Sequence, residues 1–168
     1  EERNLKITDK RIYDYLVSSI GTDVNLTAIN YFGKSISYRQ LFSNIELVSK
    51  GFHLYGVRSG DVVTICVPNT PEAIVSFYAL NNIGAIANMI DPRTSSEGIK
   101  EYIKESDSKL LIVVDVAKDK VKGIKSDTAV EDVVVISAAD SLPQPLKTLY
   151  KLKNRTKLDK SEFISWTD

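Results

Sequence analysis

The chain has 168 residues and a mass of 18.7 kDa, the usual size of one globular domain. Hydrophobic residues make up 43% of it and charged residues 26%, a composition that excludes wholesale disorder. Lysine plus arginine and aspartate plus glutamate each number 22, so the chain lacks the basic excess of proteins that bind nucleic acid or anionic membrane surfaces.

A helix is predicted first, over residues 9–20, between a Thr8 cap and a stop at Gly21. Its apolar residues recur every four positions, at Ile12, Leu16 and Ile20. The short runs Thr27–Phe32 and Ser35–Tyr38 flank a glycine-containing turn and predict a β-hairpin.

The clearest predicted element is a helix from Tyr38 to Tyr55. Ser37 and Gln40 have the spacing of a capping box, and Gly56 supplies a stop. Apolar residues at alternating steps of four and three form one stripe along this helix: Leu41, Ile45, Val48, Phe52 and Tyr55.

Apolar runs alternate with helix signals in the rest of the chain. The runs that predict strands are Val62–Val67, Ala85–Ile90, Leu110–Val114 and Val133–Ser137. One helix is predicted from Pro71 to Ile83, capped by Thr70, and ended by Gly84. A second helix is predicted after Ser95 or Ser96, with a buried side made of Ile99, Tyr102 and Ile103.

The pattern weakens toward the end of the chain. Residues 115–125 predict a lysine-rich helix or loop, and residues 146–152 a short helix between polar or proline-containing segments. Ser161–Trp166 has the composition of the start of one more helix.

These elements predict an α/β fold: an open, mostly parallel sheet of βαβ units with helices on both faces, preceded by a short helix and a β-hairpin. We expect residues 1–168 to form a single partial domain, in which residues 138–168 are a weakly structured tail. The chain starts at Glu1 and its only methionine is Met89, so we expect that an initiator was removed or that the chain was cut from a longer one.

Single residues limit the chemistry and the compartment. Cys66 is the only cysteine and His53 the only histidine, which excludes an internal disulfide and a Cys/His zinc set. Residues 1–10 lack a signal-peptide core, and asparagine and glycine interrupt the uncharged run 73–90, so no membrane span is expected. We therefore expect a reducing, cytoplasmic setting.

A search for catalytic motifs yields candidates that each have a structural explanation. Neither glycine-rich phosphate loop is present, and at Asn69–Glu72 ordinary helix capping is favoured over an anion site because Pro71 has no N–H. His53 is expected at the surface and Cys66 in the core. Asp91 follows a strand, where α/β enzymes place ligands, but a turn aspartate is the commoner explanation.

Charged residues on two predicted helices are expected to face solvent. The first set consists of Glu97, Lys100, Glu101, Lys104 and Glu105; the second consists of Lys118, Lys120 and Lys122. The second set could meet a phosphate, but in a neutral chain a solvated lysine face is favoured. The sequence therefore assigns no catalytic, cofactor-binding or metal-binding residue within these 168 positions.

Five short motifs nevertheless occur in a familiar order within residues 27–137. They are Ser35-Ile36-Ser37-Tyr38-Arg39-Gln40-Leu41, Gly56-Val57-Arg58-Ser59-Gly60-Asp61-Val62-Val63, Val67-Pro68-Asn69-Thr70-Pro71-Glu72, the pair Ile83-Gly84-Ala85 and Ile90-Asp91-Pro92, and Ser106-Asp107-Ser108 before strand Leu110–Val114. In this order and spacing they resemble the AMP-binding, acyl-adenylate-forming enzymes, which include acyl-CoA synthetases, peptide-synthetase adenylation domains and luciferases.

The resemblance implies the N-terminal part of an acyl-CoA synthetase-type ligase. In the parent, a small carboxylic acid would attack the α-phosphate of ATP, and coenzyme A or a carrier thiol would then displace AMP. The family's Ser/Thr/Gly-rich phosphate loop, its later ATP contacts and its C-terminal lysine have no counterpart here, so this part alone is expected to be inactive. ATP, Mg²⁺ and coenzyme A are implied for the parent only; residues 115–122 match no coenzyme A motif, and no site is carried over.

Two other interpretations remain open. One is a stand-alone Rossmann-like binding or scaffold module without adenylating activity; the other is a flavodoxin-like nucleotide binder, which would need a phosphate loop that is not visible. If the chain packs on the rest of a parent ligase, apolar surface should be exposed late in the sequence and could cause self-association. The residues expected in it are Leu146, Leu149, Tyr150, Phe163 and Trp166.

Overall fold

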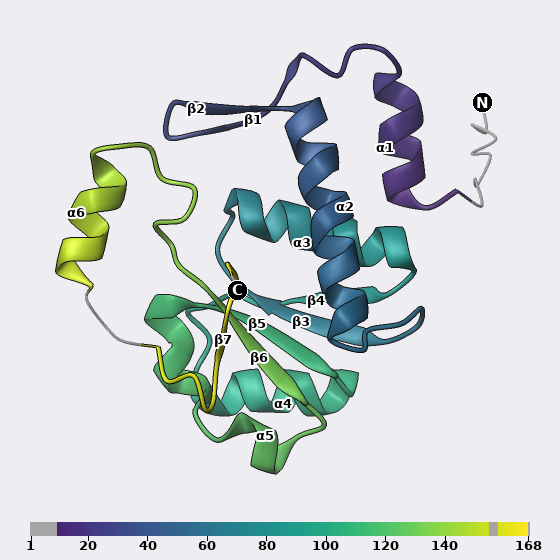
Figure 1. Ribbon diagram of the computed structural model, residues 1–168. Coiled ribbons are helices and arrows are strands. Elements are labelled where there is room, and N and C mark those ends of the chain that lie inside the picture. The colour runs from purple at the N-terminus through teal and green to yellow at the C-terminus, as the bar shows by residue number, and fades with distance from the viewer. Residues whose placement is uncertain (1–9, 155–157, 168) are drawn as a thin grey trace, which may run out of the picture.

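A computed structural model describes residues 10–154 and 158–167 of the chain (Figure 1). The first helix, α1 (Ile12–Ile20), begins later than predicted, and Thr8 and Asp9 lie outside the described residues. Its buried residue is Tyr13, which packs edge-on against Phe42, whereas Ile12 is 54% exposed. The predicted apolar stripe of this helix was therefore wrong at Ile12, because α1 packs on α3 through Tyr13, whose N–H donates to Asn81 Oδ1 at 2.8 Å.

The predicted hairpin and long helix are confirmed. Strands β1 (Thr27–Tyr31) and β2 (Lys34–Ser37) pair antiparallel, and α2 (Tyr38–Leu54) follows directly. The capping box is present in full, since the Ser37 hydroxyl accepts from the Gln40 N–H and the Gln40 side chain accepts from the Ser37 N–H. The stripe residues that α2 buries are Leu41, Ile45 and Phe52.

Five parallel strands form the main sheet, in the order β4-β3-β5-β6-β7. The four predicted strands are all present: β3 (Val62–Cys66), β4 (Ile86–Met89), β5 (Leu110–Val114) and β6 (Asp132–Ile136). The fifth, β7 (Ile164–Ser165), replaces the helix predicted at Ser161–Trp166. The Trp166 N–H donates to the Val135 carbonyl at 2.9 Å, so pairing with the open edge of β6 prevails over the local helix signal.

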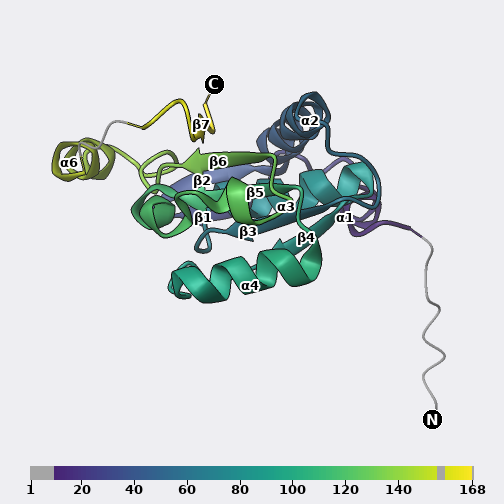
Figure 2. The same cartoon turned by 90° about the horizontal axis from the view of Figure 1, so that it is seen from below.

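Helices cover both faces of this sheet (Figure 2). The chain runs from β3 outward to β4 and then back past β3 to β5, so two right-handed crossovers place α3 (Pro71–Ile83) and α4 (Ser96–Ser106) on opposite faces. Helix α2 packs with α3, and α4 covers the other face. The predicted α/β architecture is thus confirmed.

Short helices occupy the later connections. The lysine-rich segment after β5 forms a 3-10 helix, η1 (Asp115–Val121), and then α5 (Ile124–Asp127). Helix α6 (Leu146–Lys153) lies between β6 and β7, and both views place it at the margin of the molecule, away from the other helices (Figures 1 and 2).

The core is built around β5, whose five residues are all buried. On the α4 side, Ile99 and Ile103 are buried as predicted, but Tyr102 is 50% exposed, so its predicted place in the core was wrong.

The α4 side of the sheet also contains a cluster of hydroxyl and amide groups. Thr64 Oγ1 and Ser108 Oγ lie 2.6 Å apart, and Asn88 Nδ2 donates to Thr64 Oγ1 at 3.0 Å. Each of these polar groups has a partner, so the cluster does not oppose burial.

The late apolar residues divide between core and surface. Leu146 and Leu149 are 43% and 65% exposed, as expected. Phe163 is 2% exposed and belongs to the core, and Trp166 packs partly against it, so the expectation of exposure was wrong for Phe163. Because β7 pairs with β6, Phe163 and Trp166 lie against the core.

Among the described residues, no helix is long and apolar enough to cross a membrane.

Substitution Ile65→Ala at the middle of β3 should lower the free energy of unfolding by about 3 kcal/mol, because this side chain is fully buried. The matched control Leu54→Ala, at a residue 87% exposed, should change it by less than about 0.5 kcal/mol. Urea unfolding followed by circular dichroism measures both, and equal losses would contradict the position of the core.

Candidate functional site

The carboxyl ends of the parallel strands meet at one edge of the sheet. The connections that leave β3 and β5 go to opposite faces, which makes this pair a topological switch point, where open α/β sheets bind ligands. Asp115 directly follows β5, and Ser137 directly follows β6. The candidate site starts from Asp115 at this switch point and extends to Ser137 on the neighbouring strand.

Asp115 connects three segments of the chain at this edge. One carboxylate oxygen accepts from the Ser137 hydroxyl at 2.9 Å, and the other accepts from the Tyr150 hydroxyl of α6 at 2.8 Å. Asp140 lies alongside, where its carboxylate accepts from the Ser137 N–H at 3.2 Å and its carbonyl accepts from Lys147 Nζ at 3.1 Å. The arrangement holds α6 at the carboxyl end of the sheet.

A pocket of about 360 Å³ opens among these groups, and we call it the carboxyl-edge pocket. Most of its lining is polar and consists of carboxylates, hydroxyls, two lysines and an amide: Asp115, Asp140, Ser137, Tyr150, Ser165, Thr167, Lys118, Lys151 and Asn154. These residues can hydrogen-bond a polar ligand. Among residues 10–154 and 158–167, no three His, Cys, Asp or Glu side chains gather as a metal site.

Burial controls the protonation of two lining residues. Burial, followed by donation to Asp115, raises the pKa of the Tyr150 hydroxyl, which is therefore a neutral donor at pH 7. Burial also raises the pKa of the Asp140 carboxyl, and the hydrogen bond from the Ser137 N–H opposes that effect.

The loop after β4 contains two of the sequence candidates. Asp91 accepts hydrogen bonds from Arg93, and this is the main cause that lowers the pKa of its carboxyl to about 2. Lys120 Nζ donates to the carbonyls of Pro92 and Thr94, both at 2.9 Å. The turn interpretation of Asp91 is supported, and both residues hold the shape of the loop.

The lysine face predicted on residues 118–122 is only partly correct. Lys122 is exposed and forms an ion pair with Asp119 at 2.8 Å. Lys118 is buried and Lys120 is half-buried against the preceding loop, so the prediction of a solvated face was wrong for these two. Lys118 shares a buried face of the 3-10 helix η1 with Val121, three positions later, whereas Lys120 is held by the carbonyls of the preceding loop.

The remaining candidates have structural roles. His53 is exposed, with Nδ1 3.1 Å from the Val57 carbonyl. Cys66 is fully buried, and burial raises the pKa of its thiol to about 11. At the start of α3 the Thr70 hydroxyl accepts from the Ala73 N–H at 3.3 Å, and the Glu72 carboxylate accepts from the Ser141 hydroxyl. The surface, core and capping interpretations are confirmed.

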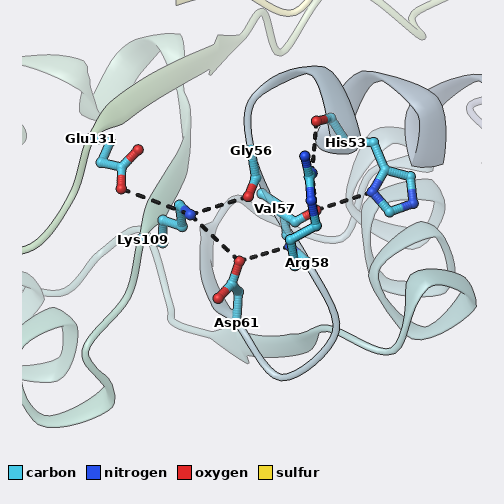
Figure 3. A network of polar contacts seen from close by, with 7 residues as sticks. All are labelled: His53, Gly56, Val57, Arg58, Asp61, Lys109 and Glu131. Carbon is cyan, nitrogen blue, oxygen red and sulfur yellow. Dashed lines mark hydrogen bonds and ion pairs between the residues drawn. The ribbon is translucent and has the colours of Figure 1, made fainter.

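The turn between α2 and β3 is held by a polar network at the opposite, amino edge of the sheet (Figure 3). Lys109 Nζ donates to the Gly56 carbonyl at 3.1 Å and lies 3.7 Å from the Asp61 carboxylate and 3.8 Å from that of Glu131. The Asp61 carboxylate also accepts from the Arg58 N–H at 2.7 Å. The motif Gly56–Val63 is therefore explained by turn geometry.

A second motif packs against that turn. The Gly60 N–H donates to the Gly84 carbonyl at 2.9 Å, and the Ile86 N–H donates to the Asp61 carbonyl at 2.8 Å. Gly84 ends α3 at φ +76°, where a Cβ would lie 2.6 Å from the Ser59 hydroxyl oxygen. Glycine is thus required at position 84 by both backbone conformation and space.

The sequence contains a signal for part of the carboxyl-edge pocket. Asp115 directly follows the predicted strand Leu110–Val114, and Ser137 is the last residue of the predicted strand Val133–Ser137; adjacent parallel strands bring such residues together. No pattern pointed to Tyr150, because its contact with Asp115 spans 35 positions and depends on where α6 lies.

A model of the family described as AMP-binding enzyme matches residues 19–163. The chain belongs to this family. The long-chain-fatty-acid–CoA ligase of Bacillus subtilis (strain 168) is 23% identical over 154 residues, which cover 92% of this chain and 28% of that protein. The 4-coumarate–CoA ligase 4 of Arabidopsis thaliana is 32% identical over 95 residues, 56% of this chain and 17% of the relative.

Solved structures of ligases have the same fold as this AMP-binding enzyme chain. The anthranilate CoA ligase AuaEII in complex with anthranoyl-AMP superposes with a TM-score of 0.72 at 23% identity, covering 76% of this chain and 25% of that one. FadD1, a long-chain-fatty-acid-CoA ligase from Archaeoglobus fulgidus, superposes with a TM-score of 0.71 at 22% identity, covering 79% and 28%. The chain spans about a quarter of the length of these proteins.

Substitution Tyr150→Phe should lower the free energy of unfolding by about 1 kcal/mol at pH 7, because it removes the hydrogen bond to Asp115. The raised pKa of Tyr150 adds stability below pH 10, its ordinary value, and this stability is lost as the pH rises above 10. The difference in the free energy of unfolding between wild type and Tyr150→Phe should therefore become smaller from pH 9 to pH 11, as measured by urea titration.

Tyr15→Phe is the control, because Tyr15 is 60% exposed on α1. This variant should follow the wild-type curve at each pH. If the difference in the free energy of unfolding between wild type and Tyr150→Phe stayed constant from pH 7 to pH 11, the Tyr150 hydroxyl could not be buried and hydrogen-bonded as described.

Proposed function

We propose that the chain is the N-terminal part of an ATP-dependent acid–thiol ligase of the acyl-CoA synthetase type. The parent would join a carboxylate oxygen to the α-phosphorus of ATP and release pyrophosphate; a thiol sulfur would then bond to the acyl carbon and release AMP. The observation that carries this proposal is the family match over residues 19–163, together with relatives named as CoA ligases that are several times longer.

ATP, Mg²⁺ and coenzyme A belong to the parent in this proposal, because the described residues do not fit them. The start of α3 is the natural place for a phosphate, yet Pro71 has no N–H there and the Thr70 hydroxyl already caps Ala73. Glu72 adds a carboxylate that would repel an anion at the same helix end. No catalytic step is therefore assigned to a residue of this chain.

The contribution of this chain would be the scaffold on which the parent assembles its site. Its partners would be the rest of the ligase and a small carboxylic acid, in the cytoplasm, where the unpaired Cys66 stays reduced. Fatty acids are candidates for the acid because one relative is a long-chain-fatty-acid–CoA ligase. By itself the chain should be inactive.

ATP–pyrophosphate exchange tests this proposal. The 168-residue chain should give no exchange with any acid, whereas the longer product of the same gene should give exchange with at least one member of a panel of short, long-chain and aromatic acids. Exchange by the 168-residue chain would contradict the proposed inactivity. A reading frame that ends near Asp168, or a longer product without exchange across the panel, would favour the stand-alone binding module instead.

A further inference from the structure

Helix α6 has its apolar side turned away from the protein. Its contacts with the rest of the molecule are polar: Tyr150 donates to Asp115, and Lys147 donates to the Asp140 carbonyl. The residues that form its apolar stripe are Leu146, Leu149 and Leu152, which are 43%, 65% and 55% exposed. No residue of this helix is buried, so its orientation is the reverse of that of an ordinary core-facing helix.

Positive charge is concentrated on the same segment. Between positions 146 and 160 the sequence has six basic residues, Lys147, Lys151, Lys153, Arg155, Lys157 and Lys160, and one acidic residue, Asp159. This segment therefore carries a net charge of +5 in a chain whose total is zero, and the remainder carries −5. The neutral total, which argued against binding to an anionic surface, hides this local excess.

A second copy of the chain, the rest of a parent ligase or a bilayer could cover the leucine stripe, and charge favours the bilayer over the second copy. A second copy of the chain would bring an equal +5 against the first, so like charges would oppose pairing of two α6 helices. An anionic bilayer instead attracts the basic residues and accepts leucine side chains between its headgroups, which is how basic amphipathic helices bind membranes. The negative remainder would orient the molecule with α6 toward the lipid.

We propose that α6 is a membrane-interface helix that inserts Leu146, Leu149 and Leu152 into the surface of an anionic bilayer. Tyr150 and its bond to Asp115 fix the helix so that the stripe faces outward. Lys151 and Lys153 are exposed on the same helix and can meet lipid phosphates, although Lys151 also lines the carboxyl-edge pocket. The inference does not require ligase activity, but it does require that the rest of a longer chain leaves the stripe uncovered. Vesicle binding is therefore measured on the longer product of the gene as well as on the 168-residue chain, and binding by the 168-residue chain alone would assign the stripe to packing on the rest of the ligase.

Co-sedimentation with lipid vesicles tests the proposal on the 168-residue chain. The chain should bind vesicles of phosphatidylglycerol and phosphatidylcholine in equal parts about tenfold more tightly than vesicles of phosphatidylcholine alone, and added salt should weaken that binding. The double variant Leu149→Ser/Leu152→Ser should lower the affinity about tenfold, and Lys151→Gln/Lys153→Gln should lower it and reduce its salt dependence.

Matched controls come from exposed residues elsewhere. Leu47→Ser/Leu54→Ser on α2 removes two leucines that are 69% and 87% exposed, and Lys50→Gln/Lys104→Gln removes two exposed lysines. Both should keep binding within about twofold of wild type, with unchanged circular dichroism. If these controls lose as much binding as the α6 variants, the proposal is wrong.

Two further results would overturn it. The first is no binding to the anionic vesicles at low salt. The second is a dimer in sedimentation velocity without lipid that Leu149→Ser/Leu152→Ser abolishes, which would assign the stripe to self-association.

Fluorescence quenching measures the depth of α6 directly. In Leu149→Trp, brominated lipids should quench the fluorescence of the new tryptophan more than they quench that of Trp166 in the wild type. Equal quenching would place α6 outside the bilayer.

Discussion

Burial of β5 on both faces is the constraint on which the rest of the structure depends. All five residues of Leu110–Val114 are withdrawn from water, so one layer of helices is not enough. Helices α2 and α3 cover one face and α4 the other (Figure 2). The right-handed crossovers that lead to α3 and α4 place β3 and β5 side by side at the centre of the sheet.

The parallel register gives the two edges of the sheet different chemistry. At the amino edge, Lys109 holds the Gly56–Asp61 turn, and Gly84 packs against it (Figure 3). The motifs Gly56–Val63 and Ile83–Ala85, which resemble those of the family, therefore maintain the turn before β3 and the end of α3. At the carboxyl edge, Asp115 and Ser137 line a polar pocket together with Tyr150. The resemblance was thus recognised through residues that shape the scaffold, while the polar pocket lies where no motif was found.

Local patterns predicted the elements whose causes are local. The Ser37–Gln40 capping box and the apolar runs of β3 to β6 depend on neighbours within a few positions, and each was confirmed. The α2 stripe was confirmed at Leu41, Ile45 and Phe52, whereas Tyr55 is exposed just after the helix. The errors involve distant contacts: Tyr13 is buried by Phe42, and residues 164–165 become a strand because β6 has an open edge. The carboxyl-edge pocket could be predicted only in part, since Tyr150 reaches it from a separate helix.

Native-state hydrogen exchange tests the central claim most directly, because it measures how each segment opens. The amides of β5 should exchange only through global unfolding, with a free energy equal to that of the whole chain and a matching dependence on urea. The amides of α6, which has polar contacts and no buried residue, should exchange through local opening that urea hardly affects. Protection of α6 equal to that of β5, or local opening of β5, would contradict the account.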